Sequence, residues 1–262
     1  MLVFAVESSC DETSVCIMNK DKKILSHIVN SQEIHKKYGG VVPELASRAH
    51  LEILQNITIK ALNEAGLKIN DIDIFAATCG PGLIGGLLVG STYTKSLSIG
   101  NAKPFIPVNH LEAHVLSTFY NNEISFPHLC LLITGGHTQI YFLENLKTIN
   151  LIGQTVDDAV GEAFDKVAKI LGLPYPGGYE IEQKALNGNE NSFILPEPLI
   201  KQDNLNFSFS GLKTSVNLIS KKNNIDEDFV KNISASFQKT VSNILIKKID
   251  RAVKNIERDK NK

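Results

Sequence analysis

The chain has 262 residues, 43% of them hydrophobic and 21% charged, and its formal net charge is −1. This composition predicts a globular protein with a core large enough for two modest domains, and the net charge excludes bulk electrostatic attraction to nucleic acid. No apolar run reaches the roughly 20 residues of a membrane span, and the first residues lack the positive charge of a signal peptide, so we expect a cytoplasmic protein.

The first half of the chain predicts the element order β-β-β-α-β-α-β-α. Short apolar runs between polar turns indicate strands, which we expect at residues 2–6, 13–18, 24–29, 72–78 and 105–108. Apolar residues at helical spacing indicate helices, which we expect from Pro43 to Gly66, from the glycine-rich loop 80–86 to Ile99, and from His110 onwards. The first three strands should form a meander.

The second half begins with the same order of elements. Strands are expected at residues 129–134, 139–143 and 148–153, and helices at residues 157–171, 180–186, 211–219 and 228–256. The repeated order predicts two duplicated α/β lobes, residues 1–125 and 126–262, with Phe126-Pro127 as a hinge. No strand is expected after the last helix, so the second lobe should lack its late strands.

The four cysteines should be reduced thiols. They show no Cys-x-x-Cys pair and lie in segments that are expected to be strands or tight loops: Cys10, Cys16, Cys79 and Cys130. We therefore expect neither a disulfide nor a cysteine metal site.

Two histidines at helical spacing form a candidate metal site. Asn109 is suited to an N-cap with Glu112 three residues later, which would place His110 and His114 on one face of the first two turns of a helix. Such a pair can hold a metal ion, and it can also be an ordinary structural pair. A zinc peptidase is disfavoured because its general-base glutamate directly follows the first ligand, whereas Glu112 lies about 200° around the helix.

Two turns occupy equivalent places in the two lobes and are candidates for phosphate binding. They are residues 7–14, with several hydroxyl side chains, and residues 134–138, with Gly135 and Gly136. Free backbone N–H groups in such turns can hold phosphate oxygens, as in actin-like and sugar-kinase ATPases. The loop 80–86 is a third candidate, although we favour close helix packing as the reason for its glycines.

Two further features have both structural and functional interpretations, and a third has a structural one. Asp165 can bind a ribose hydroxyl or pair with Lys169, and the turn 175–178 can let backbone approach a ligand or simply end a helix. The segment 207–214 enters a helix for which Ser210 is a suitable N-cap.

Seven ordered segments together resemble one known family. They are Val6–Thr13, Tyr38–His50, Gly80–Gly85, His110–His114, Ile133–Gln139, Asp157–Lys166 and Phe207–Thr214. They look like the motifs of the bacterial tRNA N6-adenosine threonylcarbamoyltransferases, formerly labelled O-sialoglycoprotein endopeptidases. The resemblance implies an actin-like fold, related to sugar kinases and ribonuclease H. It also implies transfer of a threonylcarbamoyl group from threonylcarbamoyl-AMP to N6 of adenosine 37 in tRNAs that read codons beginning with A, with release of AMP.

The resemblance also implies the residues and partners of the site. His110 and His114 should bind one metal ion, iron or zinc. The intermediate should lie along Leu132, Ile133, Thr134, Gly135 and Gly136, and Asp165 and Gly178 should hold its nucleoside part. The expected partners are a paralogous, non-catalytic actin-like protein and a small ATPase.

The sequence departs from the family pattern in two places. Tyr179 stands where the family has a proline, and nothing after Lys262 corresponds to the family's late strand, its substrate-binding Asn and its metal-binding Asp. We therefore expect a C-terminally truncated copy without the third metal ligand. An inactive copy that retains only partner binding and an actin-like small-molecule kinase stay open as alternatives.

Overall fold

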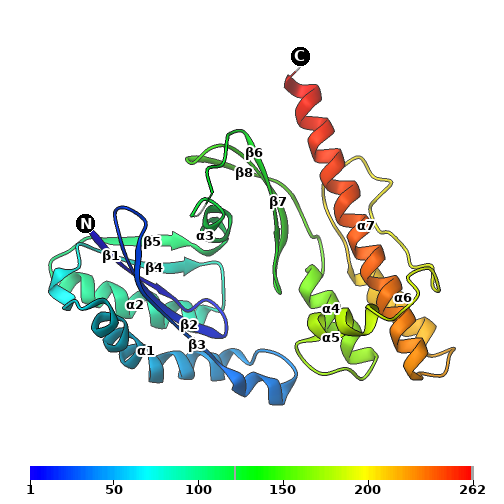
Figure 1. The fold of residues 1–262 in the computed structure, drawn as a ribbon, viewed down its shortest axis with the longest axis horizontal. Helices are drawn as coiled ribbons and strands as arrows, with labels where there is room; N and C mark the ends of the chain where they lie inside the picture. The colour runs from blue at the N-terminus through cyan, green and yellow to red at the C-terminus, as the bar shows by residue number, and fades with distance from the viewer. Residues whose placement is uncertain (121, 261–262) are drawn as a thin grey trace. The chain divides into compact units, whose positions relative to one another are not determined.

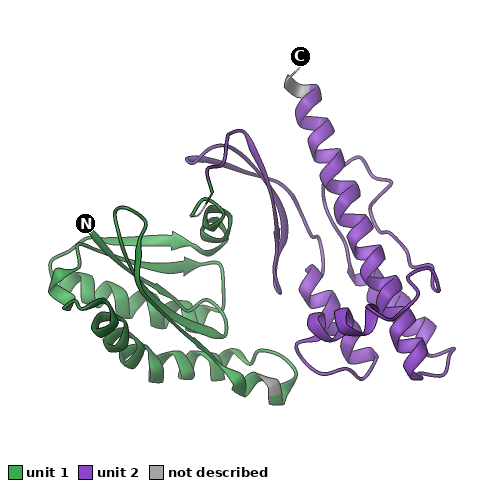
Figure 2. Ribbon diagram, viewed as in Figure 1, with its two compact units in different colours: residues 1–122 green, residues 123–262 purple. Residues whose placement is uncertain are grey.

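The computed structural model describes residues 1–120 and 122–260. The chain divides into two compact units, residues 1–122 and 123–262 (Figure 2). No helix within the described part of the chain is long and apolar enough to cross a membrane.

Unit 1 contains a five-stranded sheet in the order β3-β2-β1-β4-β5 (Figure 1). Its strands are β1 (Leu2–Glu7), β2 (Glu12–Asn19), β3 (Ile24–Ser31), β4 (Ile74–Gly80) and β5 (Phe105–Asn109). The first three form an antiparallel meander, and β4 and β5 continue the sheet parallel to β1. This is the strand order of an actin-like lobe. The order of the elements along the chain is the predicted one.

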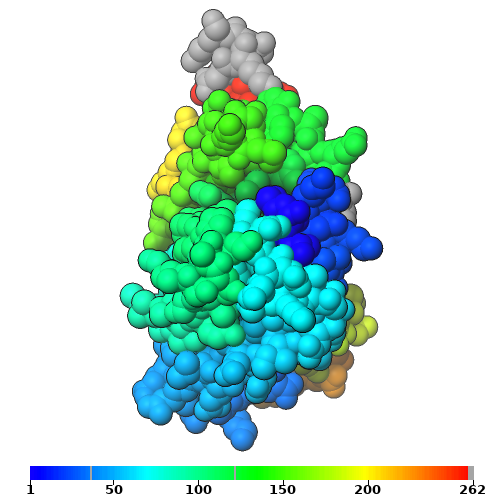
Figure 3. Space-filling model, turned by 90° about the vertical axis from the view of Figure 1, so that its left-hand side faces the viewer, coloured from blue at the N-terminus to red at the C-terminus, as the bar shows by residue number. Residues whose placement is uncertain are grey.

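Three α-helices complete unit 1: α1 (Pro43–Ala65), α2 (Ile84–Gly100) and α3 (His110–Ser117). Short 3₁₀ helices lie at Glu33–Tyr38 and Ile69–Asp71. The core forms where alternate strand residues such as Phe4 and Val6 pack against α1 and α2, which cover one face of the sheet (Figure 1). Segments coloured light blue, cyan and teal, from α1 to the end of α2, form a continuous surface on the side seen in Figure 3.

Unit 2 begins with an antiparallel sheet in the order β6-β7-β8. Its strands are β6 (His128–Ile133), β7 (Thr138–Asn145) and β8 (Thr148–Gln154), and its helices are α4 (Val160–Ile170), α5 (Gly177–Ala185), α6 (Ser210–Ser220) and α7 (Glu227–Lys260). One hydrophobic cluster joins β7 to all four helices, with Phe207, Phe209 and Phe237 fully buried in it. The predicted succession of strands and helices is confirmed.

Two helices begin about three residues away from their predicted starts. The predicted helix 157–171 begins only at Val160, because the carboxylate of Asp157 is bound to backbone and hydroxyl groups of the segment 208–210. The helix expected at 180–186 begins earlier, at Gly177, whose N–H donates to Asp165.

Lys248 is a fully buried charged side chain in unit 2. Its amine donates hydrogen bonds to the carbonyl oxygens of Leu199 and Asn204, so α7 holds the loop between α5 and α6. Burial, followed by the nearby charge of Arg251, lowers the pKa of Lys248 to about 8. The four cysteines are free, as predicted.

Candidate active site

The two predicted metal-binding histidines lie together at the start of α3. The Asn109 side chain caps this helix by accepting hydrogen bonds from the N–H groups of Leu111 (2.9 Å) and Glu112 (3.1 Å). The rings of His110 and His114 are in contact, with centroids 4.5 Å apart and planes at 80°. The N-cap and the shared helix face are therefore as the sequence predicts.

Glu7, at the end of β1, orients His110. Its Oε2 lies 3.2 Å from His110 Nδ1 and accepts a hydrogen bond from Thr78, while its Oε1 accepts one from the N–H of Ser9. Burial acts to raise the pKa of Glu7, but these hydrogen bonds, that from His110 foremost, outweigh it and lower the pKa to about 2. The carboxylate is therefore ionised, and its contact with Nδ1 leaves the other ring nitrogen for a ligand.

Sequence reasoning did not single out Glu7. Its position was the available signal, because the carboxyl ends of parallel strands in one sheet meet at the same edge. Glu7 ends β1, Thr78 lies near the end of β4, and Asn109 ends β5, next to the histidines.

The histidine pair fits two ligands of a metal ion. Metal-binding imidazoles are neutral, and a ligating histidine commonly donates its second ring N–H to a carboxylate. Burial, together with the nearby His110, lowers the pKa of His114, which favours its neutral form. The described residues contain no group of three His, Cys, Asp or Glu side chains placed for a metal.

A cavity of about 520 Å³ lies beside the pair, within unit 1. Its walls come from all five strands of the sheet and from α3. The cavity lies on the side of the sheet opposite α1 and α2, because the lining residues Ser14, Cys16 and Met18 of β2 alternate with the core residues Val15 and Ile17. His110 and His114 line the cavity, but Glu112 does not. The expected separation of Glu112 from the histidine face agrees with this arrangement, which is unlike that of a zinc peptidase.

The turn after β1 is held by contacts within unit 1. The Ser8 hydroxyl donates to the carbonyl oxygen of Gly86, and the carbonyl oxygen of Ser9 accepts from the N–H of Leu83 (2.7 Å). A Cβ built on Gly86 would overlap Ser8 O, and one on Gly82 would lie 2.6 Å from Ser9 O. The glycines of the loop 80–86 therefore allow close packing, as the sequence analysis favoured.

The turn between β6 and β7 has a different character. Thr134 and His137 bond to each other across it, through Thr134 N–H to His137 O (2.9 Å) and His137 N–H to Thr134 Oγ1 (2.9 Å). Gly135 and Gly136 are exposed, and their N–H groups donate to no other residue in the part of the chain that the structure describes. Neither glycine has a positive φ, and a Cβ on either would meet no atom within 4 Å.

No contact within residues 1–120 and 122–260 therefore requires glycine at positions 135 and 136. The two glycines instead leave two unpaired backbone N–H groups open to a ligand. Such groups can donate hydrogen bonds to an anionic or carbonyl oxygen. Leu132 is buried and Ile133 exposed on the strand that leads into this turn.

Asp165 and Gly178 lie close together in unit 2. Asp165 Oδ1 accepts a hydrogen bond from the N–H of Gly177 (2.7 Å), so α4 holds the start of α5. Burial raises the pKa of Asp165. The sequence left open a pairing of Asp165 with Lys169, and the structure instead shows the bond to Gly177. His110 and His114 belong to unit 1, and the other predicted site residues belong to unit 2.

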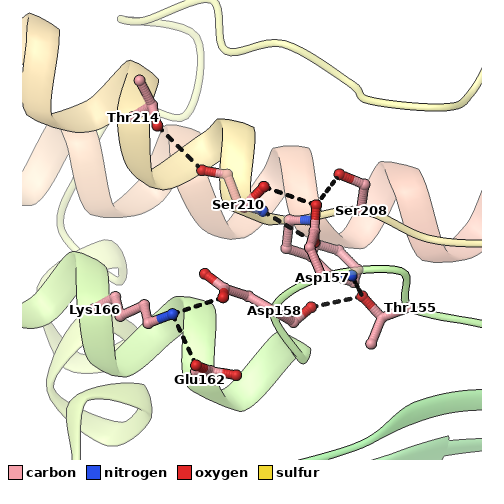
Figure 4. Close-up of polar contacts among 9 residues, drawn as sticks. Thr155, Asp157, Asp158, Glu162, Lys166, Ser208, Ser210 and Thr214 are labelled. Carbon is pink, nitrogen blue, oxygen red and sulfur yellow. Dashed lines mark hydrogen bonds and ion pairs between the residues drawn. The ribbon is translucent and has the colours of Figure 1, made fainter.

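The segment 207–214 has a structural explanation in the contacts of Asp157 (Figure 4). Its carboxylate accepts hydrogen bonds from the N–H groups of Phe209 (2.8 Å) and Ser210 (3.2 Å) and from the hydroxyls of Ser208 (2.5 Å) and Ser210 (2.7 Å). The prediction of Ser210 as the N-cap of α6 is wrong, because Ser210 is its first helical residue and Asp157 satisfies the free N–H groups.

Comparison with known proteins gives the same description for a family model and for two similar relatives. The family model described as tRNA N6-adenosine threonylcarbamoyltransferase matches residues 23–261. A protein of that name from Ehrlichia ruminantium (strain Welgevonden) is 48% identical over 253 residues, which cover 96% of this chain and 73% of the relative. Another, from Thermosipho africanus, is 49% identical over 262 residues, which cover 98% of this chain and 78% of the relative.

Among solved structures, the activator of the 2-hydroxyisocaproyl-CoA dehydratase from Clostridium difficile, with bound ADPNP, is similar to this chain. The identity is 15%, the similarity covers 98% of this chain and 76% of the activator, and the TM-score is 0.47.

Proposed function

Because the chain belongs to the tRNA N6-adenosine threonylcarbamoyltransferase family, we propose that it transfers a threonylcarbamoyl group to N6 of an adenosine in tRNA. The observation that carries this proposal is the family match over residues 23–261. In full, the donor is threonylcarbamoyl-AMP, the acceptor is adenosine 37 of tRNAs that read codons beginning with A, and AMP is released.

The proposed reaction is an acyl transfer. The N6 amine of the adenosine forms a bond to the carbonyl carbon of the threonylcarbamoyl group, the bond from that carbon to the phosphate oxygen breaks, and N6 loses a proton. Negative charge develops on the carbonyl oxygen and then on the departing phosphate. Hydrogen-bond donors that are fixed before the reaction stabilise such charge most effectively, and the free N–H groups of Gly135 and Gly136 are donors of this kind.

His110 and His114 would hold one divalent metal ion, iron or zinc. The ionised carboxylate of Glu7 supports this role, because it fixes the orientation of the His110 ring through Nδ1. A bound ion would supply a Lewis acid for the carbonyl or phosphate oxygen of the donor.

Asp165 and Gly178 would bind the nucleoside part of the donor. Asp165 Oδ1 is fixed by the N–H of Gly177, and no hydrogen bond joins Oδ2 to another described residue. That oxygen can accept a hydrogen bond from a ribose hydroxyl, while Gly178, without a side chain, leaves the backbone at the start of α5 open to the ligand. Leu132, Ile133 and Thr134 would lie along the remainder of the donor.

The proposed partners are the tRNA substrate, a paralogous non-catalytic actin-like protein and a small ATPase, and the proposed location is the cytoplasm. The formal net charge of −1 supports assembly with partners, since the chain has no bulk positive charge for tRNA binding.

The proposal is tested by incubating the purified chain and its partners with threonylcarbamoyl-AMP and a tRNA transcript. After digestion to nucleosides, mass spectrometry should detect threonylcarbamoyl-adenosine at position 37, in an amount that depends on the chain and on the donor. A tRNA with guanosine at position 37 is the matched control and should stay unmodified. Absence of the modified nucleoside with all components present contradicts the proposal.

A further inference from the structure

Both end residues of the turn 134–138 are hydrogen-bonded to the first turn of α4. On one side, the carbonyl oxygen of Thr134 accepts a hydrogen bond from the N–H of Gly161 (3.4 Å). On the other side, Thr138 Oγ1 accepts one from the N–H of Val160 (2.9 Å), and the carbonyl oxygen of Thr138 accepts one from the N–H of Thr155 (2.9 Å). The turn is therefore fixed by α4 and by the segment that leads into it.

Thr138 replaces the missing cap of α4. The first N–H groups of a helix have no partner within it, and a side chain at the N-cap position usually accepts one of these hydrogen bonds. The N-cap residue of α4 is Ala159, which has no side-chain acceptor. Thr138, which is fully buried and 22 residues before Val160, supplies the hydroxyl oxygen instead. One hydroxyl group thus links the first turn of α4 to the turn 134–138.

Gly161 lets the two elements approach closely. A Cβ at this position would lie 2.7 Å from Gly135 Cα and 3.0 Å from Thr134 O, both of them backbone atoms of the turn. Any other residue at position 161 would therefore push the turn away from α4. Glycine is required here, in contrast to Gly135 and Gly136, where a Cβ would meet nothing within 4 Å.

The same helix carries Asp165, one helical turn after Gly161. At 1.5 Å per residue, the two positions are about 6 Å apart along the helix axis. α4 is consequently a rigid spacer between the free N–H groups of the Gly135–Gly136 turn and the carboxylate that holds the start of α5.

We propose that Thr138 and Gly161 are positioning residues for the transfer reaction: they set the distance between the Gly135–Gly136 turn and Asp165, and so the fit of the donor. This inference rests on the proposed function, because it concerns the donor of that reaction. Neither residue needs to touch the substrate. Displacement of reacting groups by about 1 Å can lower a rate by roughly a hundredfold, so small shifts of the turn have large effects.

Four variants separate positioning from general stability. Thr138→Val keeps the shape but removes the acceptor oxygen, whereas Thr138→Ser keeps the oxygen. Gly161→Ala pushes on the turn directly. Thr240→Val is the matched control, because Thr240 is also a buried threonine of unit 2, and its hydroxyl donates to Ser236 O in its own helix, α7, not to the turn.

The experiment measures transfer kinetics with the full set of partners, together with thermal unfolding. Thr138→Val and Gly161→Ala should lower kcat/KM for threonylcarbamoyl-AMP by about tenfold to a hundredfold, with KM for tRNA unchanged. Thr138→Ser should restore at least half of the wild-type value. Thr240→Val should keep the wild-type kinetics even where its midpoint of unfolding falls as far as that of Thr138→Val. Wild-type kinetics in Thr138→Val, or no recovery in Thr138→Ser, overturns the inference.

A second measurement does not depend on transfer. In ¹⁵N–¹H spectra, the amide signals of Gly135 and Gly136 should shift in Thr138→Val and Gly161→Ala, but stay in place in Thr138→Ser and Thr240→Val. If the wild type transfers nothing, the proposed function fails, and these spectra still decide the placement of the turn. Unmoved glycine signals in Thr138→Val overturn the inference whatever the activity of the wild type.

Discussion

The turn after β1 in unit 1 and the turn after β6 in unit 2 have equivalent places in the chain but opposite uses of glycine. In unit 1, the turn residues Ser8 and Ser9 are buried, and glycines of the neighbouring segment, such as Gly86, are required because the turn packs on them. In unit 2, the glycines are in the turn itself, where they are exposed and sterically unnecessary.

One carboxylate in each unit also shows a contrast between a functional and a structural role. Glu7 in unit 1 is bonded to His110, and so orients a candidate metal ligand. Asp157 in unit 2 is bonded to Ser208, Phe209 and Ser210, and so anchors the start of α6. A glycine or a carboxylate in a motif thus has a functional or a structural role according to what it contacts, and substitutions can test each assignment.

The largest effect on stability is expected from Gly86→Ala. Its new Cβ would overlap the backbone oxygen of Ser8, and such overpacking typically costs about 1–3 kcal/mol of unfolding free energy. Gly136→Ala should change the stability by less than about 0.5 kcal/mol, because its Cβ meets open space, as in ordinary surface substitutions. Urea denaturation followed by circular dichroism measures both values.

Gly136→Ala, which should barely change the stability, should nevertheless impair transfer activity. Gly136→Ala should raise KM for threonylcarbamoyl-AMP, because a methyl group beside the free N–H hinders close approach of the donor. Gly100→Ala is the control for both assays, since its Cβ also meets nothing within 4 Å and it lies at the end of α2. If Gly136→Ala were as unstable as Gly86→Ala, glycine would be required for stability in both regions, which contradicts the difference between the two turns.

The next effect concerns the metal proposed for unit 1. Glu7→Gln keeps the shape of the side chain but removes the negative charge beside His110 Nδ1, and changes of this kind typically weaken metal binding about 10- to 100-fold. Competition with a chelator of known affinity measures the change. Glu112→Gln is the matched control, because Glu112 is on the same helix but does not line the cavity. Equal metal affinity in the two variants would show that Glu7 does not support the metal site.

Much of the fold was predictable because its signals are local. The long helix ending at Gly66 and the Asn109 cap before the histidine pair depend on spacing and capping within a few residues, and both are present. The strand meander of unit 1 follows from alternation and turns in the same way.

The errors and omissions all involve contacts between distant parts of the sequence. The start of α4 was misplaced because Asp157, which looks like a residue of the first helical turn, is bound to Phe209, 52 residues later. Glu7 and His110 are 103 residues apart, and the cap of α4 comes from Thr138. No pattern within a short window reports such pairs, so the residues of the candidate site could be proposed, but not those that hold them in place.

A smaller effect should follow from Asp157→Asn. The amide can still accept hydrogen bonds from the N–H groups of Phe209 and Ser210, but it has no negative charge for them, and loss of a good helix cap costs about 1 kcal/mol. Denaturation at pH 7 should detect this loss. Asp228→Asn, a highly exposed carboxylate on α7, is the control and should be neutral within about 0.5 kcal/mol. A neutral Asp157→Asn would show that the anchor of α6 lies in its apolar contacts instead.

The smallest expected effect is the pH dependence of the same anchor. Burial acts to raise the pKa of Asp157, but the hydrogen bonds from Ser208, Phe209 and Ser210 outweigh it and hold the pKa below the ordinary value of 3.8. A depressed pKa in the folded state adds stability that is complete above the unfolded pKa and is lost as the pH falls through the folded one. The stability difference between wild type and Asp157→Asn should therefore be constant from pH 7 to 5 and shrink below about pH 4. Asn does not titrate, so the change of this stability difference with pH reports Asp157 alone, because the other carboxylates are present in both proteins. If this stability difference instead grows on acidification, the folded state favours the protonated form of Asp157. Asp157 would then differ from the ionised Glu7 of unit 1 in its charge as well as in its contacts.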